Sequence, residues 1–247
     1  MSKGNLAVKE EFDDIIVNEA IINEKPVNNI RIINKEKTNK KILYRAIKRM
    51  IDIIGAIVGI IFLIPTTIAV CLARKISKED KGPLFYEQLR YGKNGKVFRL
   101  YKFRSMCIGA DEKLKEYLAN NEEARREFKK THKLQNDPRI TSIGNFLRKT
   151  SLDELPQMIN ILKGDMSFVG PRPVVEKEVE EYGENKEKFL SVKPGLTGYW
   201  QVNGRSNTTY EERMEMELYY VDNCSLWLDI KIFFKTFIAV FKKEGAV

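Results

Sequence analysis

The sequence is 247 residues long, carries a formal net charge of +9 and contains three cysteines and one histidine. This length suits one compact catalytic domain with appendages, and the charge favours an anionic partner: a phospholipid surface, a nucleic acid or a phosphorylated substrate. The dispersed cysteines and the single histidine exclude a zinc cluster. Catalysis is therefore left to carboxylates, Lys, Arg or Tyr, unless His132 takes part from its Lys-rich stretch.

Residues 1–40 are rich in Asn, Lys, Glu and Ile and show no sustained helical or alternating period. We interpret them as a mostly disordered tail. The sequence begins without the basic and then apolar pattern of a secretory signal. The tail is therefore expected in the cytoplasm.

Residues 41–76 are predicted to form a membrane helix around 21 uncharged residues, 53–73, which is about the length needed to cross the hydrocarbon layer. Basic residues flank this run on both sides, so the positive-inside rule places both ends on the cytoplasmic face. Pro65 lies inside the run and favours a kink. Together these features favour a re-entrant helix that bends and returns. An ordinary kinked transmembrane helix is the alternative.

Residues 77–222 are predicted to form the catalytic domain. Two extended stretches within 84–103 flank an Asn-Gly turn and predict a β-hairpin; the spacing does not fit a phosphate-binding loop. Charge and apolar periodicity predict helices over 110–134, 142–162 and 176–190, the second one broken near Ser151 and ended by Gly164.

Residues 223–247 are predicted to form an amphipathic helix with one apolar stripe. The stripe fits either a membrane interface or a contact with the protein core, and both remain open. Its members are Ile230, Phe233, Phe234, Phe237, Ile238 and Phe241. The whole chain is thus expected to be α+β and mainly helical, with a helix-kink-helix in the membrane, a small β-hairpin, a compact helical catalytic domain and this C-terminal helix.

Asp153 and Glu154 form a neighbouring acid pair within a segment rich in Arg, Gly and Pro. Ser151 and Glu154 have the spacing of a helix capping box, which would make the pair structural. A helix start also attracts phosphate, Arg148 and Arg139 offer bidentate contacts, and carboxylates beside a diphosphate recruit Mg²⁺. Spacing alone leaves the structural and the catalytic interpretation open.

Several motifs in order resemble the bacterial sugar transferase family, the monotopic polyprenyl-phosphate phosphoglycosyl transferases. The resemblance covers roughly residues 44–240. The motifs are KRMID at 48–52, YKFRSM at 101–106, DPR at 137–139, SLDELPQ at 151–157, GDMSFVGPRP at 164–173, KPGLTG at 193–198 and QVNGR at 201–205.

The resemblance implies a two-step phosphosugar transfer from a UDP-sugar to polyprenyl phosphate, with release of UMP. Asp153 is then the nucleophile and, with Glu154, a ligand of Mg²⁺; Glu154 alternatively handles a proton or completes the helix cap. Glucose or galactose is the expected sugar, ahead of an N-acetylated one. Five basic residues are expected to contact the phosphates or the nucleotide. They are Arg148, Arg172, Lys102, Arg104 and Arg139.

The resemblance also implies a monotopic protein at the cytoplasmic face of the inner membrane, with a re-entrant helix broken at Pro65. Lys48, Arg49 and Asp52 are then expected at the headgroup level. The chain has Ile64 where the family commonly has Ser before the proline. The expected partners are the UDP-sugar, polyprenyl phosphate and the phospholipid membrane, without nucleic acid; a homo-oligomer is left open. A non-catalytic basic protein that binds membranes or nucleic acid is the alternative from another class.

Overall fold

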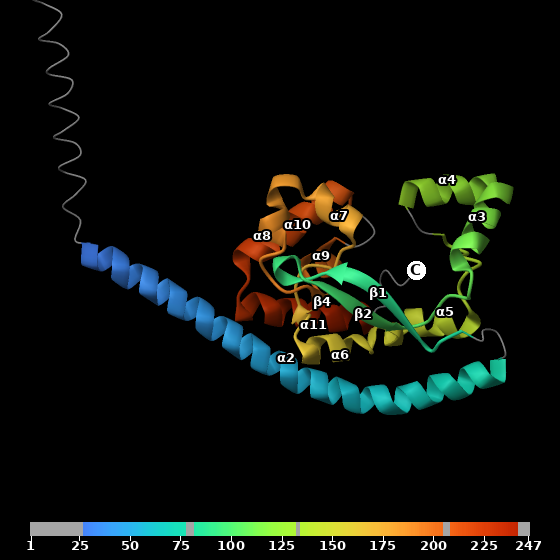
Figure 1. Cartoon of the computed structure of the whole chain (residues 1–247), viewed down its shortest axis with the longest axis horizontal. Coiled ribbons are helices and arrows are strands. Elements are labelled where there is room, and N and C mark those ends of the chain that lie inside the picture. The colour runs from blue at the N-terminus through green and yellow to red at the C-terminus, as the bar shows by residue number, and fades with distance from the viewer. Residues whose placement is uncertain (1–26, 78–81, 132–133, 205–207, 242–247) are drawn as a thin grey trace, which may run out of the picture. The chain divides into compact units, whose positions relative to one another are not determined.

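The computed structural model describes residues 27–77, 82–131, 134–204 and 208–241. Contacts divide the chain into a first unit, Met1–Ile47, and a second unit, Lys48–Val247. Within the described residues helices predominate and strands are short, as the sequence predicts (Figure 1). All elements that carry the candidate site belong to the second unit.

The apolar segment lies in one long helix, α2 (Val27–Ser77). Of the described residues, only the stretch Lys41–Ser77 is long and apolar enough to cross a membrane. The helix begins at Val27, so 27–40 are helical rather than part of a disordered tail, while 1–26 lie outside the described residues. No Gly or Pro occurs between Val27 and Ile54, and each added helical residue gains a hydrogen bond once the helix exists.

Pro65 does not break α2. The helix continues through it, and the part of α2 after Lys48 curves without interruption in Figure 1. The hydroxyl of Thr66 donates to the Phe62 carbonyl (2.8 Å), and that of Thr67 donates to the Leu63 carbonyl (2.7 Å). Such bonds to the preceding turn satisfy carbonyls near the proline and bend a helix gently. The predicted helix-kink-helix is thus a continuous, curved helix.

The predicted hairpin is confirmed: β1 (Phe85–Tyr91) pairs with β2 (Val97–Phe103) in antiparallel register. Asn94 and Gly95 in the turn have φ values of +57° and +75°, the left-handed conformation that Asn-Gly pairs favour. Along β2, burial alternates over residues 97–100, where Phe98 and Leu100 are buried on one face. Phe103, at the end of the strand, has the opposite parity and is buried in a separate cluster with Leu63 and Leu147.

The predicted helical regions are confirmed, with additional breaks. Asn121 separates the first region into two helices because its backbone is extended and its side chain accepts a hydrogen bond from Ala124 N (3.0 Å), starting the next helix. Gly164 ends the second region with φ +87°. The helices are α3 (Ala110–Asn120), α4 (Glu122–Thr131), α5 (Ser142–Lys149), α6 (Gln157–Lys163), α7 (Glu176–Glu181), α8 (Lys186–Phe189), α9 (Tyr199–Asn203), α10 (Tyr210–Asn223) and α11 (Leu226–Phe241).

A second, parallel strand pair was not predicted: β3 (Ser167–Val169) pairs with β4 (Gly195–Thr197). The two strands approach so closely that a Cβ at residue 195 would lie 2.1 Å from the Gly170 nitrogen. Glycine is therefore required at this crossing. Strands of three residues leave too short an alternation for the sequence to reveal them.

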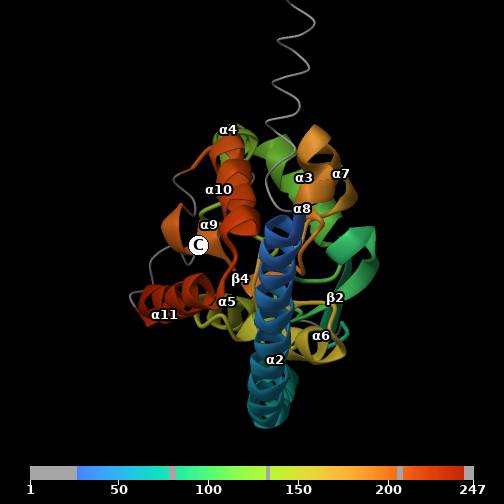
Figure 2. The same cartoon turned by 90° about the vertical axis from the view of Figure 1, so that its left-hand side faces the viewer.

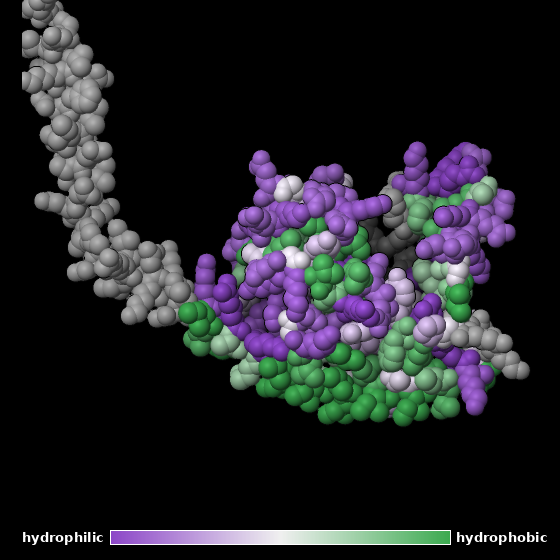
Figure 3. Space-filling view, viewed as in Figure 1, coloured by the Kyte–Doolittle hydropathy of each residue, from purple (hydrophilic) through white to green (hydrophobic). Residues whose placement is uncertain are grey.

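The domain packs along α2. Ala56 is buried among side chains of β2 and α6, and Leu63 and Val70 are buried against Phe103 and Leu147. The opposite side of α2 exposes a row of large apolar side chains, part of a hydrophobic band in Figure 3. This row comprises Ile54, Ile57, Val58, Ile61, Phe62, Ile64, Ile68 and Leu72. An apolar surface of this extent marks an interaction surface rather than ordinary solvent contact.

The terminal helix α11 has apolar side chains on two faces. Ile232 and Ala239 are buried against the domain, so α11 contributes to the core. Phe234 and Ile238 are 63% and 56% exposed and point away from it. The predicted core contact is therefore confirmed for one face of α11, and a membrane contact of the exposed face stays a prediction.

Three charged residues near the start of the apolar run bind α2 to the domain. Lys48 Nζ pairs with Asp229 of α11 (2.7 Å), and Arg49 donates to the Ile161 carbonyl of α6 (2.6 Å). Figure 2 shows α6 and α11 on opposite sides of α2. Asp52 is 3% exposed and accepts hydrogen bonds from the Ser167 hydroxyl and the Phe168 backbone N–H. These hydrogen bonds compensate the buried charge of Asp52. The predicted headgroup level of Lys48, Arg49 and Asp52 concerns depth in a membrane and stays a prediction.

Candidate active site

Asp153 lies in a short turn between α5 and α6. This turn, η2 (Leu152–Glu154), follows Ser151, whose φ of +56° is unusual for a residue other than glycine. The buried Pro156 then leads into α6. Ser151, with its backbone in the left-handed conformation, precedes the two acids, and the rigid Pro156 follows them. Together they hold the turn in a sharp bend. Such local strain persists where surrounding packing enforces it, and it is common at functional sites.

The capping-box interpretation of Ser151 and Glu154 is wrong. The Ser151 side chain makes no capping hydrogen bond. Glu154 instead pairs through Oε1 with Lys102 Nζ of β2 at 2.7 Å. Both side chains are about one-third exposed, so the pair contributes little to stability. Glu154 is therefore directed toward a basic side chain of the hairpin and not toward the helix backbone.

Burial raises the pKa of Asp153 to about 6. The positive charges of Lys102 and Arg148 lower the pKa, while the neighbouring Glu154 raises it. Asp153 is consequently ionised at neutral pH, but its charge is poorly solvated. A carboxylate in this condition is a stronger base and a more available nucleophile than an exposed one.

Arg148 is held beside Asp153 by Ser105. Its Nε donates to the Ser105 hydroxyl at 2.9 Å, and this bond does not use the two terminal nitrogens of the guanidinium. Burial lowers the pKa of Arg148, and the charge of Asp153 opposes that shift. Arginine remains charged even so. The structure thus unites Lys102, Arg148 and the two acids, as the sequence predicts.

Arg139 is already paired. Its guanidinium forms a two-pronged ion pair with Asp137 (2.6 and 2.8 Å), and both side chains are largely buried. Burial alone would raise the pKa of Asp137, but the hydrogen bonds from Arg139 lower it below the ordinary value. Arg139 therefore serves first to stabilise the loop before α5. Its predicted phosphate contact would have to share the guanidinium with Asp137.

The remaining predicted basic residues are Arg104 and Arg172. Arg104 Nε donates to the Pro83 carbonyl (3.0 Å), which ties the hairpin to the chain after α2. Arg172 exposes its side chain between the buried Pro171 and Pro173. Among the contacts of the described residues, none joins Arg172 or Arg104 to Asp153. Only a bound substrate would bring Arg172 into the same chemistry.

Glu217 of α10 is a buried acid that the sequence did not reveal. It is 0% exposed, and its two carboxylate oxygens accept from the Arg172 backbone N–H at 3.1 and 3.2 Å. Burial raises the pKa of Glu217 to about 7, although the hydrogen bond from Arg172 lowers it. Neighbouring helix positions carry other acids, such as Glu215, so no sequence signal distinguishes this one. Glu217 fixes the backbone that presents Arg172.

The acid pair fits a cation that is held mainly by substrate. The described residues contain no group of three or more His, Cys, Asp or Glu side chains able to hold a metal ion. Mg²⁺ needs only one or two carboxylates when phosphate oxygens and water complete its coordination. Asp153 and Glu154 meet that requirement. An all-protein metal cage is not present among these residues.

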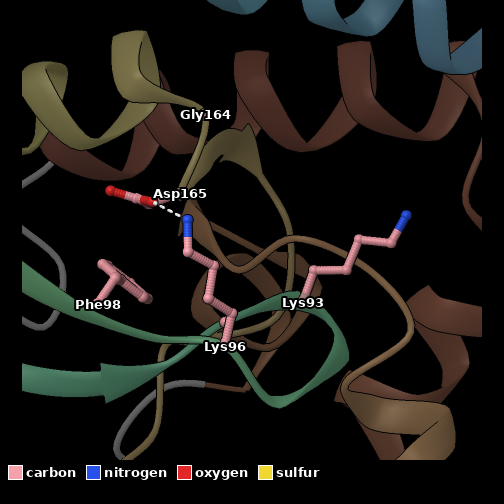
Figure 4. Close-up of a pocket in the computed structure, with 6 residues that line it drawn as sticks. Lys93, Lys96, Phe98, Gly164 and Asp165 are labelled. Atoms are coloured by element: carbon pink, nitrogen blue, oxygen red, sulfur yellow. Dashed lines mark ion pairs between the residues drawn. The ribbon is translucent and has the colours of Figure 1, made fainter.

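A small cavity of about 50 Å³ lies at the hairpin turn, away from the acid pair. In Figure 4 Lys96 points toward Asp165 (3.6 Å), and Lys93 points away from it. The turn lysines therefore neutralise a local carboxylate or face outward. This arrangement agrees with a structural hairpin rather than a phosphate-binding loop.

The family model for "Bacterial sugar transferase" matches residues 43–243. The chain therefore belongs to the bacterial sugar transferase family, a family of transferase enzymes, as the sequence motifs indicate. Family membership favours the enzyme over the non-catalytic alternative.

Individual relatives are named for related transfers. The chain is 49% identical over 202 residues to an undecaprenyl-phosphate galactose phosphotransferase of Salmonella typhimurium, covering 82% of this chain and 42% of the relative. It is 46% identical over 199 residues to the exopolysaccharide production protein ExoY of Sinorhizobium fredii, covering 81% and 87%. The UDP-glucose:undecaprenyl-phosphate glucose-1-phosphate transferase of Escherichia coli is 38% identical over 228 residues, covering 89% and 46%. The chain thus spans less than half the length of several curated relatives, but most of ExoY.

Proposed function

We propose that this protein transfers a hexose-1-phosphate, from UDP-glucose or UDP-galactose, to polyprenyl phosphate of the undecaprenyl type. UMP is the second product, and the polyprenyl diphosphate-sugar enters exopolysaccharide or other glycan assembly. The names of the relatives support the acceptor and the two candidate sugars. The observation that carries the proposal is that Asp153 is half-buried in a sharp turn where the charges of Lys102 and Arg148 act on its carboxyl.

The transfer takes place in two displacements at phosphorus. The Asp153 carboxylate attacks the sugar-proximal phosphorus, and the bond from this phosphorus to the bridging oxygen breaks as UMP leaves. An oxygen of polyprenyl phosphate then attacks the same phosphorus. The bond to Asp153 breaks, which returns a free carboxylate and completes the new diphosphate. Each step exchanges one phosphorus–oxygen bond for another and needs no oxidant or reductant.

The residues around Asp153 have different roles in the transfer. Arg148 and Lys102 offset the negative charge of the phosphates, which otherwise repels the attacking carboxylate. Glu154 holds Lys102 in place and, with Asp153, would hold Mg²⁺. The ion would supply further charge neutralisation at the diphosphate. Arg172 contacts the nucleotide or diphosphate from its stiff Pro-Arg-Pro loop.

The membrane arrangement that fits best is monotopic, with α2 entering and leaving one leaflet at the cytoplasmic face. Domain side chains cover Ala56, Leu63 and Val70 along one side of α2. A helix that crossed the bilayer would carry its distal half away from a cytoplasmic domain. Basic residues at both ends of the apolar run favour the same side for both. The acid pair would then meet a soluble UDP-sugar and a lipid phosphate at the interface.

A labelling experiment tests the covalent step. The full-length protein is incubated with UDP-sugar labelled in the sugar-proximal phosphate, without lipid, and quenched in acid. The proposal expects protein-bound label and one equivalent of UMP, with neither in Asp153→Asn. Adding polyprenyl phosphate should move the label to lipid. Transfer that requires both substrates together and never labels the protein would contradict the two-step mechanism, and absence of lipid product with every UDP-hexose would contradict the function.

A further inference from the structure

An apolar groove of about 490 Å³ lies between the second half of α2 and α5. Its walls include Thr66, Ala69 and Ala73 of α2 and Ile143 and Phe146 of α5, and Leu152 lies at the turn that carries the acid pair. The volume is in the range of sites for small organic ligands. We call this feature the α2–α5 groove.

The groove exists because α2 carries small residues where it faces α5. Ala69 and Ala73 are four residues apart and therefore share one helix face. Larger side chains at these positions would close the space opposite Phe146. The Thr66 hydroxyl is already bonded to the Phe62 carbonyl (2.8 Å) and presents its methyl group as readily as its oxygen. The walls consequently offer a ligand almost only apolar contact.

The groove borders the turn that carries the acid pair. Leu152 lines the groove and is joined directly to Asp153, while Arg148 follows the groove-lining Leu147 in α5. An apolar groove whose lining residues are chain neighbours of a cation and an acid suits an amphiphile with a hydrocarbon tail and an anionic head. The nucleotide and sugar of the donor substrate are too polar for such walls.

The groove also opens toward the apolar surface of the protein. Phe146, which lines it, is 60% exposed, and Leu72 of α2, which precedes the groove-lining Ala73, is 57% exposed. A lipid chain dissolved in the membrane would therefore reach the groove without crossing water. The continuity of the two apolar surfaces favours a ligand that arrives from the membrane over one that arrives from solution.

We propose that the α2–α5 groove holds the first isoprene units of the polyprenyl phosphate acceptor and directs its phosphate toward Asp153. This assignment rests on the proposed function for the identity of the amphiphile. Because the hydrocarbon chain comes from the membrane and not from water, it contributes to binding through its packing contacts with the apolar walls. The groove then serves the second displacement alone, because the donor substrate does not enter it.

Kinetics of matched variants test the assignment. Ala69→Phe fills the groove, and Ile68→Phe adds a ring on the exposed side of the same helix turn. Ala69→Phe should raise the KM for undecaprenyl phosphate about tenfold, because the ring takes the place of the isoprene units and removes their packing contacts; a factor of ten corresponds to about 1.4 kcal/mol. The KM for UDP-sugar and the labelling of the protein without lipid should stay within twofold of the unsubstituted protein. Ile68→Phe should change neither KM by more than twofold.

Photo-crosslinking of the unsubstituted protein gives an independent measurement. A polyprenyl phosphate with a diazirine on its second isoprene unit should label the segments 66–73 and 142–152. Excess undecaprenyl phosphate should suppress the label, and excess phosphatidylglycerol should not. Equal acceptor KM values for Ala69→Phe and Ile68→Phe, label confined to other segments, or equal suppression by phosphatidylglycerol would each overturn the assignment. Absence of transfer by the unsubstituted protein would instead overturn the proposed function.

Discussion

Replacing Asp153, the proposed nucleophile, should stabilise the protein while abolishing its activity. Asp153→Asn keeps the size of the side chain but removes the charge of a half-buried carboxyl. Burial raises the pKa of Asp153 from 3.8 to about 6, and one pKa unit corresponds to about 1.4 kcal/mol. The charged form is therefore disfavoured by up to about 3 kcal/mol. Because the side chain keeps some solvent contact, we expect a gain of about 2 kcal/mol.

The pH dependence identifies the source of this gain. The native state holds the Asp153 proton more tightly than the unfolded state, so its contribution to stability is fully present below pH 3.8 and is lost as the pH rises through about 6. Asp153→Asn has no such loss. The variant and the unsubstituted protein should thus be equally stable near pH 4, and the difference should reach its maximum above pH 6.

Thermal unfolding of both proteins in detergent between pH 4 and 8 measures this difference. A gain of about 2 kcal/mol corresponds to a melting temperature higher by roughly 4–8 °C at pH 8. Glu187→Gln removes an exposed carboxyl and serves as the control, with little change at any pH. Turnover of Asp153→Asn should fall at least about a thousandfold. A melting difference that is absent at pH 8, or equal at pH 4 and pH 8, would refute the assignment of Asp153 as a buried, destabilised acid.

Three further changes test the surroundings of the nucleophile. Lys102→Met removes a charge that lowers the pKa of Asp153, so the acidic limb of the pH–rate profile should move to higher pH. Turnover at pH 6.5 should fall several-fold more than turnover at pH 8.5. Parallel pH–rate profiles of the variant and the unsubstituted protein would contradict this role. Glu217→Ala removes the acceptor for the Arg172 N–H and should raise the KM for UDP-sugar about tenfold, with a smaller change in kcat. Glu217→Gln should restore most of the affinity. Equal KM values for the two variants would show that the hydrogen bond does not position Arg172. Asn160→Leu leaves the Tyr101 N–H and the Arg99 carbonyl without their hydrogen-bond partner, which should lower the free energy of unfolding by about 2–4 kcal/mol. The control Asn145→Leu, on the exposed face of α5, should lower it by less than about 1 kcal/mol.

Local features were readily predicted from sequence. Asn94 and Gly95 favour left-handed backbone, which sets the hairpin turn, and Gly164 ends α6 for the same reason. The motifs place Asp153 and Glu154 together and identify the family. These predictions succeed because they depend on backbone preference or on residues adjacent in the chain.

Other outcomes depend on contacts between distant residues. Pro65 alone favours a kink, yet packing of Leu63 and Val70 on the domain and the Thr66 and Thr67 hydroxyls keep α2 continuous. The capping box has the right spacing but loses Glu154 to Lys102, which lies 52 residues earlier. A favourable local motif is overridden when a distant partner offers a charge.

The sequence by itself therefore determined the family, the hairpin, the order of helices and the identity of the acid pair. Only the tertiary structure decided that Asp52 is buried, that Glu217 holds the Arg172 loop and that an apolar groove borders the turn of Asp153. The physical reason is that burial is a property of what surrounds a side chain. Two carboxyls can have similar neighbours in sequence although one lies on an exposed helix and the other in the core. Folding alone removes water from the second.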